Sequence, residues 1–113
     1  MGWVNLSPLA TFSLEELSNA GKVIDRVGLT KAGRALDKHG NRPGSPFPKV
    51  TGNSEMKNMQ GQAQLEFILN HPNKKLILDG ERGVEIYIPD GRGAYFRPDG
   101  SFRGFVEEGL RNG

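Results

Sequence analysis

The sequence predicts an α+β domain in which N-terminal helices pack on a twisted four-stranded antiparallel β-meander. Two observations predict this class. Capped helical patterns lie before Pro72, and alternating strand patterns separated by short turns begin at Lys75. Because the helices precede the strands along the chain, the two kinds of element are segregated, as in the α+β class.

Length and composition limit what the chain can be. With 113 residues and 35% hydrophobic content it fits one compact domain, with a lead-in and short helix over residues 1–28 and the main domain over residues 29–113. The absence of cysteine excludes disulfides, thiol nucleophiles and thiolate metal sites. No apolar run approaches the roughly 18 residues that cross a bilayer, so we expect no membrane insertion.

The N-terminal segment combines an extended lead-in with a short helix. Residues 1–12 have no clear period, and we expect their apolar side chains to pack: Trp3, Val4, Leu6 and Leu9. Ser13 is placed to cap a helix, and Glu16 completes a capping box three residues later. The helix is expected to stop at Gly21.

A second helix is expected to begin after Thr30 as N-cap and to stop with Gly40 in the C-terminal capping position. Its last turn then holds Lys38 and His39. The segment from Gly40 to Gly52 contains three prolines and no helical or strand period, which predicts a long loop. Loops of this length inside compact domains are usually functional or disordered.

A third helix follows, with Asn53 or Ser54 as its cap and Pro72 at its end. Apolar residues recur at helical spacing, namely Met56, Met59, Ala63 and Phe67, joined near the end by Ile68 and Leu69. We expect the two methionines in the core. A glycine inside a helix costs about 1 kcal/mol relative to alanine, so Gly61 indicates close packing against a neighbour.

The remaining chain is expected to form four strands, Leu76–Leu78, Val84–Ile88, Gly93–Arg97 and Phe102–Val106, with turns at residues 79–80, 89–91 and 98–100. Alternation assigns one face to the core: Val84, Ile86, Ile88, Ala94 and Phe96. The opposite face is expected to be a substrate surface and carries Glu85, Tyr87, Tyr95 and Arg97.

Basic residues gather in two parts of the chain, although the formal net charge is only +2. The middle contains Lys31, Arg34, Lys38, Arg42 and Lys49, and the C-terminal part contains Arg82, Arg92, Arg97, Arg103 and Arg111. Such clusters favour a polyanionic partner, because phosphate neutralisation supplies most sequence-independent affinity for nucleic acid. A solvated basic surface is the alternative.

Metal and covalent hydrolase chemistry are weakly supported. The chain has two histidines, no histidine pair at helical spacing, no dense carboxylate cluster and no G-x-S-x-G pattern. Cleavage of RNA needs less apparatus, because the 2′-hydroxyl of the substrate is the nucleophile and the protein only transfers protons and stabilises charge on the phosphorane. His39 beside Lys38, followed by Arg42, Lys49 and Thr51, offers those residue types.

The same residues have structural explanations. Cations in the last turn of a helix interact favourably with its dipole by roughly 0.3–1 kcal/mol, which accounts for Lys38 and His39 from position alone. His71 occupies the same place at the end of the third helix, and we favour its structural interpretation. Arg92 has two interpretations, as a turn residue or as a site residue. Tyr95 also has two, as part of an inert sheet face or as a ring that stacks on a base.

Three segments carry a resemblance to a known family. They are LTKAGRALDKHGNRPGSPFPKVTGN over Leu29–Asn53, QGQAQLEFILNHP and PDGRGAYFRPDGSFRGF. In this order they resemble the C-terminal domains of bacterial polymorphic toxins of the contact-dependent growth inhibition type, over most of residues 29–106. Such domains end large secreted proteins, and each is paired with an immunity protein. The resemblance implies a ribonuclease of the barnase, EndoU, colicin and RelE (BECR) fold group that acts without a metal or another cofactor, commonly on tRNA.

The positions that match this family are Lys38, His39, Arg42, Thr51, Arg92 and Tyr95, and with the neighbouring basic residues they give two candidate sets. The catalytic set is His39, Lys38, Arg92, Tyr95 and Thr51. The substrate-binding set is Arg34, Arg42, Lys49, Arg97 and Arg103. Within the catalytic set, His39 is expected to be the general acid or base, Lys38 and Arg92 to stabilise the phosphorane, Tyr95 to stack on or donate to the substrate, and Thr51 to orient it.

We therefore expect an antibacterial toxin domain that is a metal-independent endoribonuclease acting on RNA, foremost tRNA. It is expected to form the C-terminal part of a large secreted or cell-surface protein and to act in the cytoplasm of the target cell. The expected partners are RNA and an acidic cognate immunity protein over the basic cleft, and a host factor that assists cleavage is also considered. The alternatives are a non-catalytic RNA- or protein-binding module and a nuclease acting on DNA.

Overall fold

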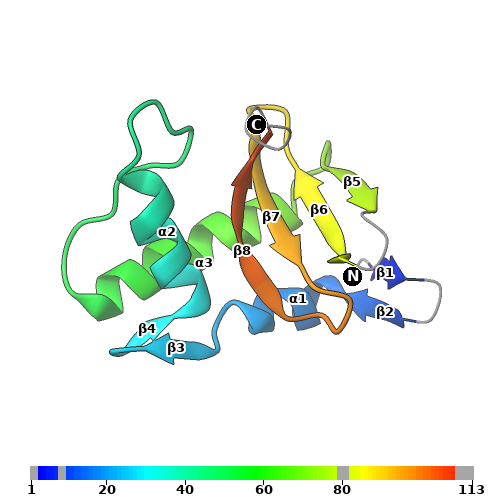
Figure 1. Ribbon diagram of the computed structural model, residues 1–113, viewed down its shortest axis with the longest axis horizontal. Coiled ribbons are helices and arrows are strands. Elements are labelled where there is room, and N and C mark those ends of the chain that lie inside the picture. Colours follow the sequence, from blue (N-terminus) through cyan, green and yellow to red (C-terminus); the bar gives the residue numbers. More distant parts are fainter. Residues whose placement is uncertain (1–2, 8–9, 79–81, 109–113) are drawn as a thin grey trace.

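The helices and strands separate into the layers expected of an α+β domain. The computed structural model describes residues 3–7, 10–78 and 82–108. In Figure 1, α3 (Ser54–Leu69) crosses one face of a four-stranded antiparallel sheet, which confirms the expected class and meander. α1 (Leu14–Ala20) packs on α3, and α2 (Lys31–Gly40) lies beside the edge strand β8 (Phe102–Glu107).

The lead-in is a two-stranded hairpin. β1 (Trp3–Ser7) pairs with β2 (Ala10–Ser13) in antiparallel register, with Val4 opposite Phe12. The extended backbone expected there is therefore present, but as paired strands. The expected packing falls on side chains outside the described part of the chain: Trp3, Val4, Leu6 and Leu9.

The capping box at the start of α1 is confirmed. The Ser13 hydroxyl accepts from the backbone N–H of Glu16 at 3.0 Å, and the Glu16 carboxylate accepts from the backbone N–H of Ser13 at 2.9 Å. The helix ends at Gly21, as expected. Leu17 is fully buried, so this short helix is held to the core by its apolar side.

A second hairpin, which the sequence pattern did not reveal, precedes α2. β3 (Ile24–Arg26) and β4 (Leu29–Thr30) are joined by a two-residue turn in which Val27 and Gly28 have φ angles of 52° and 76°. Asn58 of α3 anchors this turn, because its side-chain carbonyl accepts from Thr30 N–H at 2.8 Å and its amide donates to the Gly28 carbonyl at 2.9 Å.

α2 begins and carries its charges as expected. The Thr30 hydroxyl accepts from Gly33 N–H at 2.9 Å, and Lys38 and His39 lie in the last turn. The expected role of Gly40 is wrong by one position: Gly40 is the last helical residue, and Asn41 is the C-cap. A Cβ on Gly40 would lie 2.2 Å from the Pro48 carbonyl oxygen, so this glycine permits close contact with the following loop.

The loop between α2 and α3 is confirmed as a long segment without helix or strand, over residues 41–53. Its middle is not solvated, because Phe47 and Val50 are buried with 3% and 8% of their surfaces exposed. The loop is therefore fixed against the core beside the end of α2.

α3 turns a different side to the core than its apolar pattern predicts. The two methionines expected inside, Met56 and Met59, are exposed, and so are Ala63 and Phe67 of the same apolar pattern. The buried stripe is Gly61, Leu65, Ile68 and Leu69. The cause is Gly61, where a Cβ would lie 2.3 Å from the Ala32 carbonyl oxygen of α2. The close helix contact expected at this glycine is thus confirmed, and it sets the rotation of α3.

The meander has the strand order expected from the turns. It comprises β5 (Lys75–Leu78), β6 (Val84–Tyr87), β7 (Arg92–Phe96) and β8, each paired with its neighbour. Gly91 and Gly100 adopt φ angles of 96° and 88° in the two Pro-Asp-Gly turns. The turn expected at Asp79 and Gly80 lies outside the described residues.

The two faces of the sheet are assigned correctly, but the outer face is less open than expected. The inner set is buried: Val84, Ile86, Ile88, Ala94 and Phe96. On the outer face, Glu85 and Tyr87 are also buried, with 8% and 1% exposed. A Cβ on Gly93 would lie 2.6 Å from Tyr87 Cδ1, and the Tyr87 hydroxyl donates to Glu85 at 3.0 Å. The ring therefore lies over the neighbouring strand, and these two residues are structural.

Candidate active site

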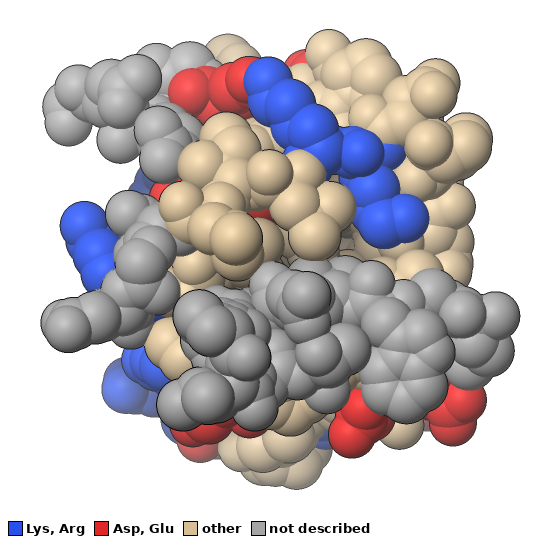
Figure 2. Space-filling model, turned by 90° about the vertical axis from the view of Figure 1, so that its right-hand side faces the viewer, with Lys and Arg blue, Asp and Glu red and all other residues tan. Residues whose placement is uncertain are grey.

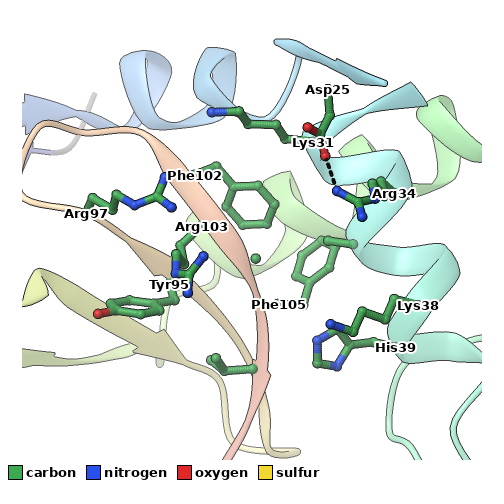
Figure 3. Close-up of a pocket in the computed structure, with 13 residues that line it drawn as sticks. Asp25, Lys31, Arg34, Lys38, His39, Tyr95, Arg97, Phe102, Arg103 and Phe105 are labelled. Carbon is green, nitrogen blue, oxygen red and sulfur yellow. Dashed lines mark hydrogen bonds and ion pairs between the residues drawn. The ribbon is translucent and has the colours of Figure 1, made fainter. Parts of the chain in front are cut away.

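A groove of about 580 Å³ lies between α2 and the β7–β8 edge of the sheet (Figure 3). One wall comes from α2, where spacings of three and four residues place basic side chains on one helix face: Lys31, Arg34 and Lys38. The other wall carries Tyr95 of β7, Arg103 of β8 and Arg97, which directly follows β7. Both walls are cationic, which is the arrangement that holds a phosphate backbone.

Aromatic residues form the base of this groove. Phe102 and Phe105 lie between the two walls in Figure 3, and only 2% and 3% of their surfaces are exposed. The rings pack edge to face with centroids 5.2 Å apart. A rigid apolar base keeps the charged walls at a fixed separation.

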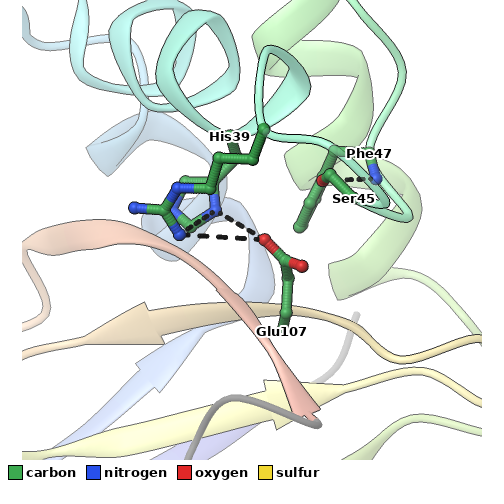
Figure 4. A network of polar contacts seen from close by, with 5 residues as sticks. His39, Ser45, Phe47 and Glu107 are labelled. Carbon is green, nitrogen blue, oxygen red and sulfur yellow. Dashed lines mark hydrogen bonds and ion pairs between the residues drawn. The ribbon is translucent and has the colours of Figure 1, made fainter. Parts of the chain in front are cut away.

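His39 lies at one end of the groove, on the last turn of α2. Its Nδ1 is 3.1 Å from Glu107 Oε2, and each of the two side chains is 11% exposed (Figure 4). The ring also lies against Phe47, with centroids 5.7 Å apart, and Phe47 packs in turn on Phe105. The imidazole is therefore held on one side by a carboxylate and on another by the anchored loop.

The contacts around Nδ1 fix which nitrogen is available for chemistry. Arg42 Nη1 lies 3.4 Å from His39 Nδ1 and 3.8 Å from Glu107 Oε2. The shorter contact is with the carboxylate, which can only accept when ionised, so we assign the proton of the neutral ring to Nδ1. Nε2 then carries the free lone pair.

The surroundings of His39 favour its neutral form. Burial lowers the pKa of His39 below its ordinary value, and the hydrogen bond with Glu107 opposes this shift without cancelling it. The positive charges of Arg42 and Lys38 lower the pKa further. A histidine that is neutral at pH 7, with a fixed tautomer and nearby cations, is suited to accept a proton next to a phosphate.

Most of the residues singled out in the sequence come together here. The groove is lined by His39, Lys38, Tyr95, Arg34, Arg97 and Arg103, and Arg42 contacts His39 beside it. Tyr95 has a structural contact as well, because its hydroxyl donates to the Arg82 carbonyl at 2.7 Å.

Besides Arg42, three predicted site residues do not line the groove. Lys49 and Thr51 are exposed on the loop, and the Thr51 carbonyl accepts from Gln60. Arg92 is opposite Glu107 in the strand register, but its side chain turns to α3. Its guanidinium donates to Asp90 and Gln64 and lies over the Phe67 ring, 5.0 Å from the centroid.

The structure adds residues that the sequence did not single out. Glu107 and Phe47 position His39, and Asp25 lines the groove. Lys31, named above only as part of a basic cluster, lines it as well. Glu107 is separated from His39 by 68 positions, so no local spacing connects them. The only feature of the sequence that could have pointed to Glu107 is its position at the end of the last strand, just after the alternating apolar pattern.

Other parts of the described surface offer less. Figure 2 shows the side on which β5 and the N-terminal hairpin lie, and there Lys and Arg side chains occupy a small part of the described surface. Within the described residues, no group of three or more His, Asp or Glu side chains is placed to hold a metal ion. No helix in the described ranges is long and apolar enough to cross a membrane.

Comparison with known proteins places these features in a family. Residues 17–107 match the family model described as the CdiA C-terminal tRNase toxin domain. The chain is also similar to the crystallised toxic C-terminal tip of CdiA from Pseudomonas aeruginosa in complex with an immune protein, with a TM-score of 0.65 and 29% sequence identity. That match covers 79% of this chain and 99% of the other. No curated protein matches the sequence.

Proposed function

The chain belongs to the CdiA C-terminal tRNase toxin domain family, and on this premise we propose that it cleaves tRNA by metal-independent attack of the substrate 2′-hydroxyl on the adjacent phosphate. The observation that carries the proposal is the position of His39, which Glu107 orients at the end of a cationic groove. We also assign the fold to the BECR group, for which the helices before an antiparallel meander are the supporting feature.

The proposed reaction needs one base and several cations. His39 Nε2 accepts the proton of the 2′-hydroxyl, and the resulting oxyanion attacks the neighbouring phosphorus. Lys38 and Arg42 stabilise the negative charge that builds up on the phosphorane. The bond to the 5′-oxygen then breaks, water supplies the proton for that oxygen, and a 2′,3′-cyclic phosphate remains.

The groove walls hold the RNA on either side of this centre. Arg34 extends from α2, Arg103 extends from β8, and Arg97 directly follows β7. Guanidinium groups bind phosphate oxygens in fixed, often bidentate geometry. Tyr95 offers an aromatic face for a base. We assign no catalytic step to Arg92 or Thr51, because the Arg92 guanidinium contacts Asp90 and α3 and the Thr51 carbonyl contacts α3.

The test is cleavage of purified tRNA by the purified domain in EDTA. We expect cleavage by the wild type and a loss of about 100-fold or more in His39→Ala, the usual size of a general-base contribution. His71→Ala is the matched control, because His71 does not line the groove and its ring contacts Phe67. Loss of wild-type cleavage in EDTA contradicts the metal-free mechanism.

Two other results identify the alternatives, and a third identifies a required host factor. Binding of tRNA without cleavage, in the presence or absence of a divalent metal, indicates a non-catalytic binding module. Cleavage confined to DNA indicates a nuclease of another class. Activity that appears only after a cell extract is added indicates that a host factor is required.

We further propose that an acidic immunity protein covers the groove. The similar CdiA tip was crystallised with an immune protein, and the groove of this chain offers a cationic surface. Opposite charges accelerate association and give specificity, so the association rate should fall steeply as salt is raised. A partner with a basic interface, or a rate independent of salt, contradicts this.

The toxin is proposed to end a large cell-surface protein and to act in the cytoplasm of the target cell.

A further inference from the structure

Asp25 is an unexpected residue in this groove. Among the residues that line it, Asp25 is the one with a carboxylate, and 31% of its side chain is exposed. A carboxylate repels the phosphates that the neighbouring Lys and Arg side chains attract. A ligand group that binds next to Asp25 must therefore offer hydrogen-bond donors and not phosphate oxygens.

The backbone holds Asp25 firmly in place. It lies on β3, and the β3–β4 hairpin is tied to α3 through Asn58 and to the start of α2 by the bond from Lys31 N–H to the Val23 carbonyl, 2.8 Å long. The turn includes Val27, a β-branched residue with a φ of 52°. Left-handed backbone is unfavourable for such a residue, so the surrounding contacts maintain this tight turn.

Arg34 and Asp25 form a pair at the groove wall, as Figure 3 shows. Arg34 Nη1 donates to Asp25 Oδ2 at 2.8 Å, and within the described residues Asp25 Oδ1 makes no hydrogen bond. The hydrogen bond with Arg34 lowers the pKa of Asp25 below its ordinary value, so the carboxylate stays ionised. The pair thus presents hydrogen-bond acceptors next to unused guanidinium donors.

We propose that Asp25 and Arg34 bind the base-pairing edge of an unpaired guanine close to the cleaved phosphodiester, an inference that rests on the ribonuclease function proposed above. Guanine offers two adjacent donors, N1–H and the 2-amino group, to the carboxylate, and its O6 accepts from the guanidinium. The other three bases do not present two adjacent donors on this edge.

The position along α2 sets the distance from the cleavage site. Arg34 precedes His39 by five residues, which is about 7.5 Å along a helix axis. Stacked nucleotides rise about 3.4 Å per residue of one strand. The recognised guanine therefore lies within about two nucleotides of the scissile phosphate.

The test uses the cleaved tRNA site transferred to a short oligonucleotide. First, the ends of the products are mapped, and a guanine is expected within two nucleotides of the cleaved bond. That guanine is then replaced by inosine, which keeps O6 and N1–H but lacks the 2-amino group. We expect the wild type to prefer guanine in kcat/KM by about tenfold, the lower range for a good base contact.

Substitutions separate base recognition from a purely structural role. Asp25→Asn should reduce the preference for guanine over inosine to nearly one. Asp37→Asn is the matched control, because Asp37 pairs with Lys57 away from the groove, and it should keep the preference. If Asp25 only held Arg34, Asp25→Asn would lower cleavage of both oligonucleotides equally and leave the preference unchanged.

The outcomes also separate this inference from the proposed function. Cleavage of RNA with no guanine near the cut, or with equal rates for guanine and inosine, overturns the role of Asp25 and leaves the ribonuclease intact. Absence of cleavage of any RNA by the wild type overturns the proposed function itself.

Discussion

Replacing Glu107 by glutamine is the most informative single change at the candidate site. It keeps the size and the hydrogen-bonding capacity of the side chain but removes the charge that lies 3.1 Å from His39 Nδ1. The amide can present either its oxygen or its nitrogen to the ring, so the Nδ1–H tautomer is no longer enforced.

The size of the effect follows from the burial of the pair. Both side chains are only 11% exposed, so solvent screens their interaction weakly. Hydrogen bonds to charged groups contribute about 1.5–3 kcal/mol, which corresponds to a loss of roughly 10- to 100-fold in the rate of tRNA cleavage. Glu107→Gln should therefore retain some activity, unlike His39→Ala.

The pH profile provides a second and independent readout. A general base must be neutral, so kcat/KM rises with pH through the pKa of His39, and burial places that rise below the ordinary histidine range. Glu107 raises the pKa of His39, so removing its charge should move the rise to still lower pH. Glu108→Gln is the control, because Glu108 pairs with Lys75. Unchanged rate and unchanged profile in Glu107→Gln refute the positioning role.

Three further predictions concern residues whose roles the fold explains. Arg92→Ala should lower the free energy of unfolding by about 1–3 kcal/mol, because Asp90 and Gln64 lose a partly buried partner, while cleavage per folded molecule changes little; urea unfolding and kcat measured on one preparation check this, and a large loss of kcat in a stable protein contradicts it. Val27→Asn should stabilise the protein by about 1 kcal/mol, because asparagine tolerates the left-handed turn before Gly28; a lower urea midpoint contradicts the strain at this residue. Gly61→Ala should destabilise by about 2–3 kcal/mol through its clash with the α2 backbone; an unchanged melting temperature contradicts the close helix contact.

Local signals in the sequence correctly predict several elements of the fold. The capping box at Ser13 and Glu16, the N-cap at Thr30 and the Pro-Asp-Gly turns each act within a few residues, so spacing alone predicts the elements that they delimit. The cationic pair at the end of α2 was located in the same way. These elements bring Lys38 and His39 to the groove.

Features that depend on distant contacts were not predicted. The apolar pattern of α3 pointed to Met59, but the backbone contact at Gly61 rotates that side outward. The β3–β4 turn could not be predicted, because valine at position 27 is not one of the residues, Asn, Asp or Gly, that usually mark a two-residue hairpin turn. Glu107 reaches His39 only because β8 lies beside α2.

The same limit applies to the outer face of the sheet. Alternation placed Glu85 and Tyr87 on that face correctly, but it could not show that the Tyr87 ring lies over Gly93. The burial of a strand residue depends on the side chains that pack against it. Those side chains come from the neighbouring strand, so the alternation within one strand does not reveal them.

A 2′-deoxy substitution in the substrate tests the central claim most directly. An oligonucleotide that contains the mapped cleavage site is prepared with the 2′-hydroxyl removed only at the nucleotide that precedes the cut, and it is incubated with the wild type in EDTA. The proposed mechanism predicts that this oligonucleotide stays intact, while the all-ribose form yields a 2′,3′-cyclic phosphate. Cleavage of the 2′-deoxy oligonucleotide at the same bond contradicts attack by the substrate hydroxyl.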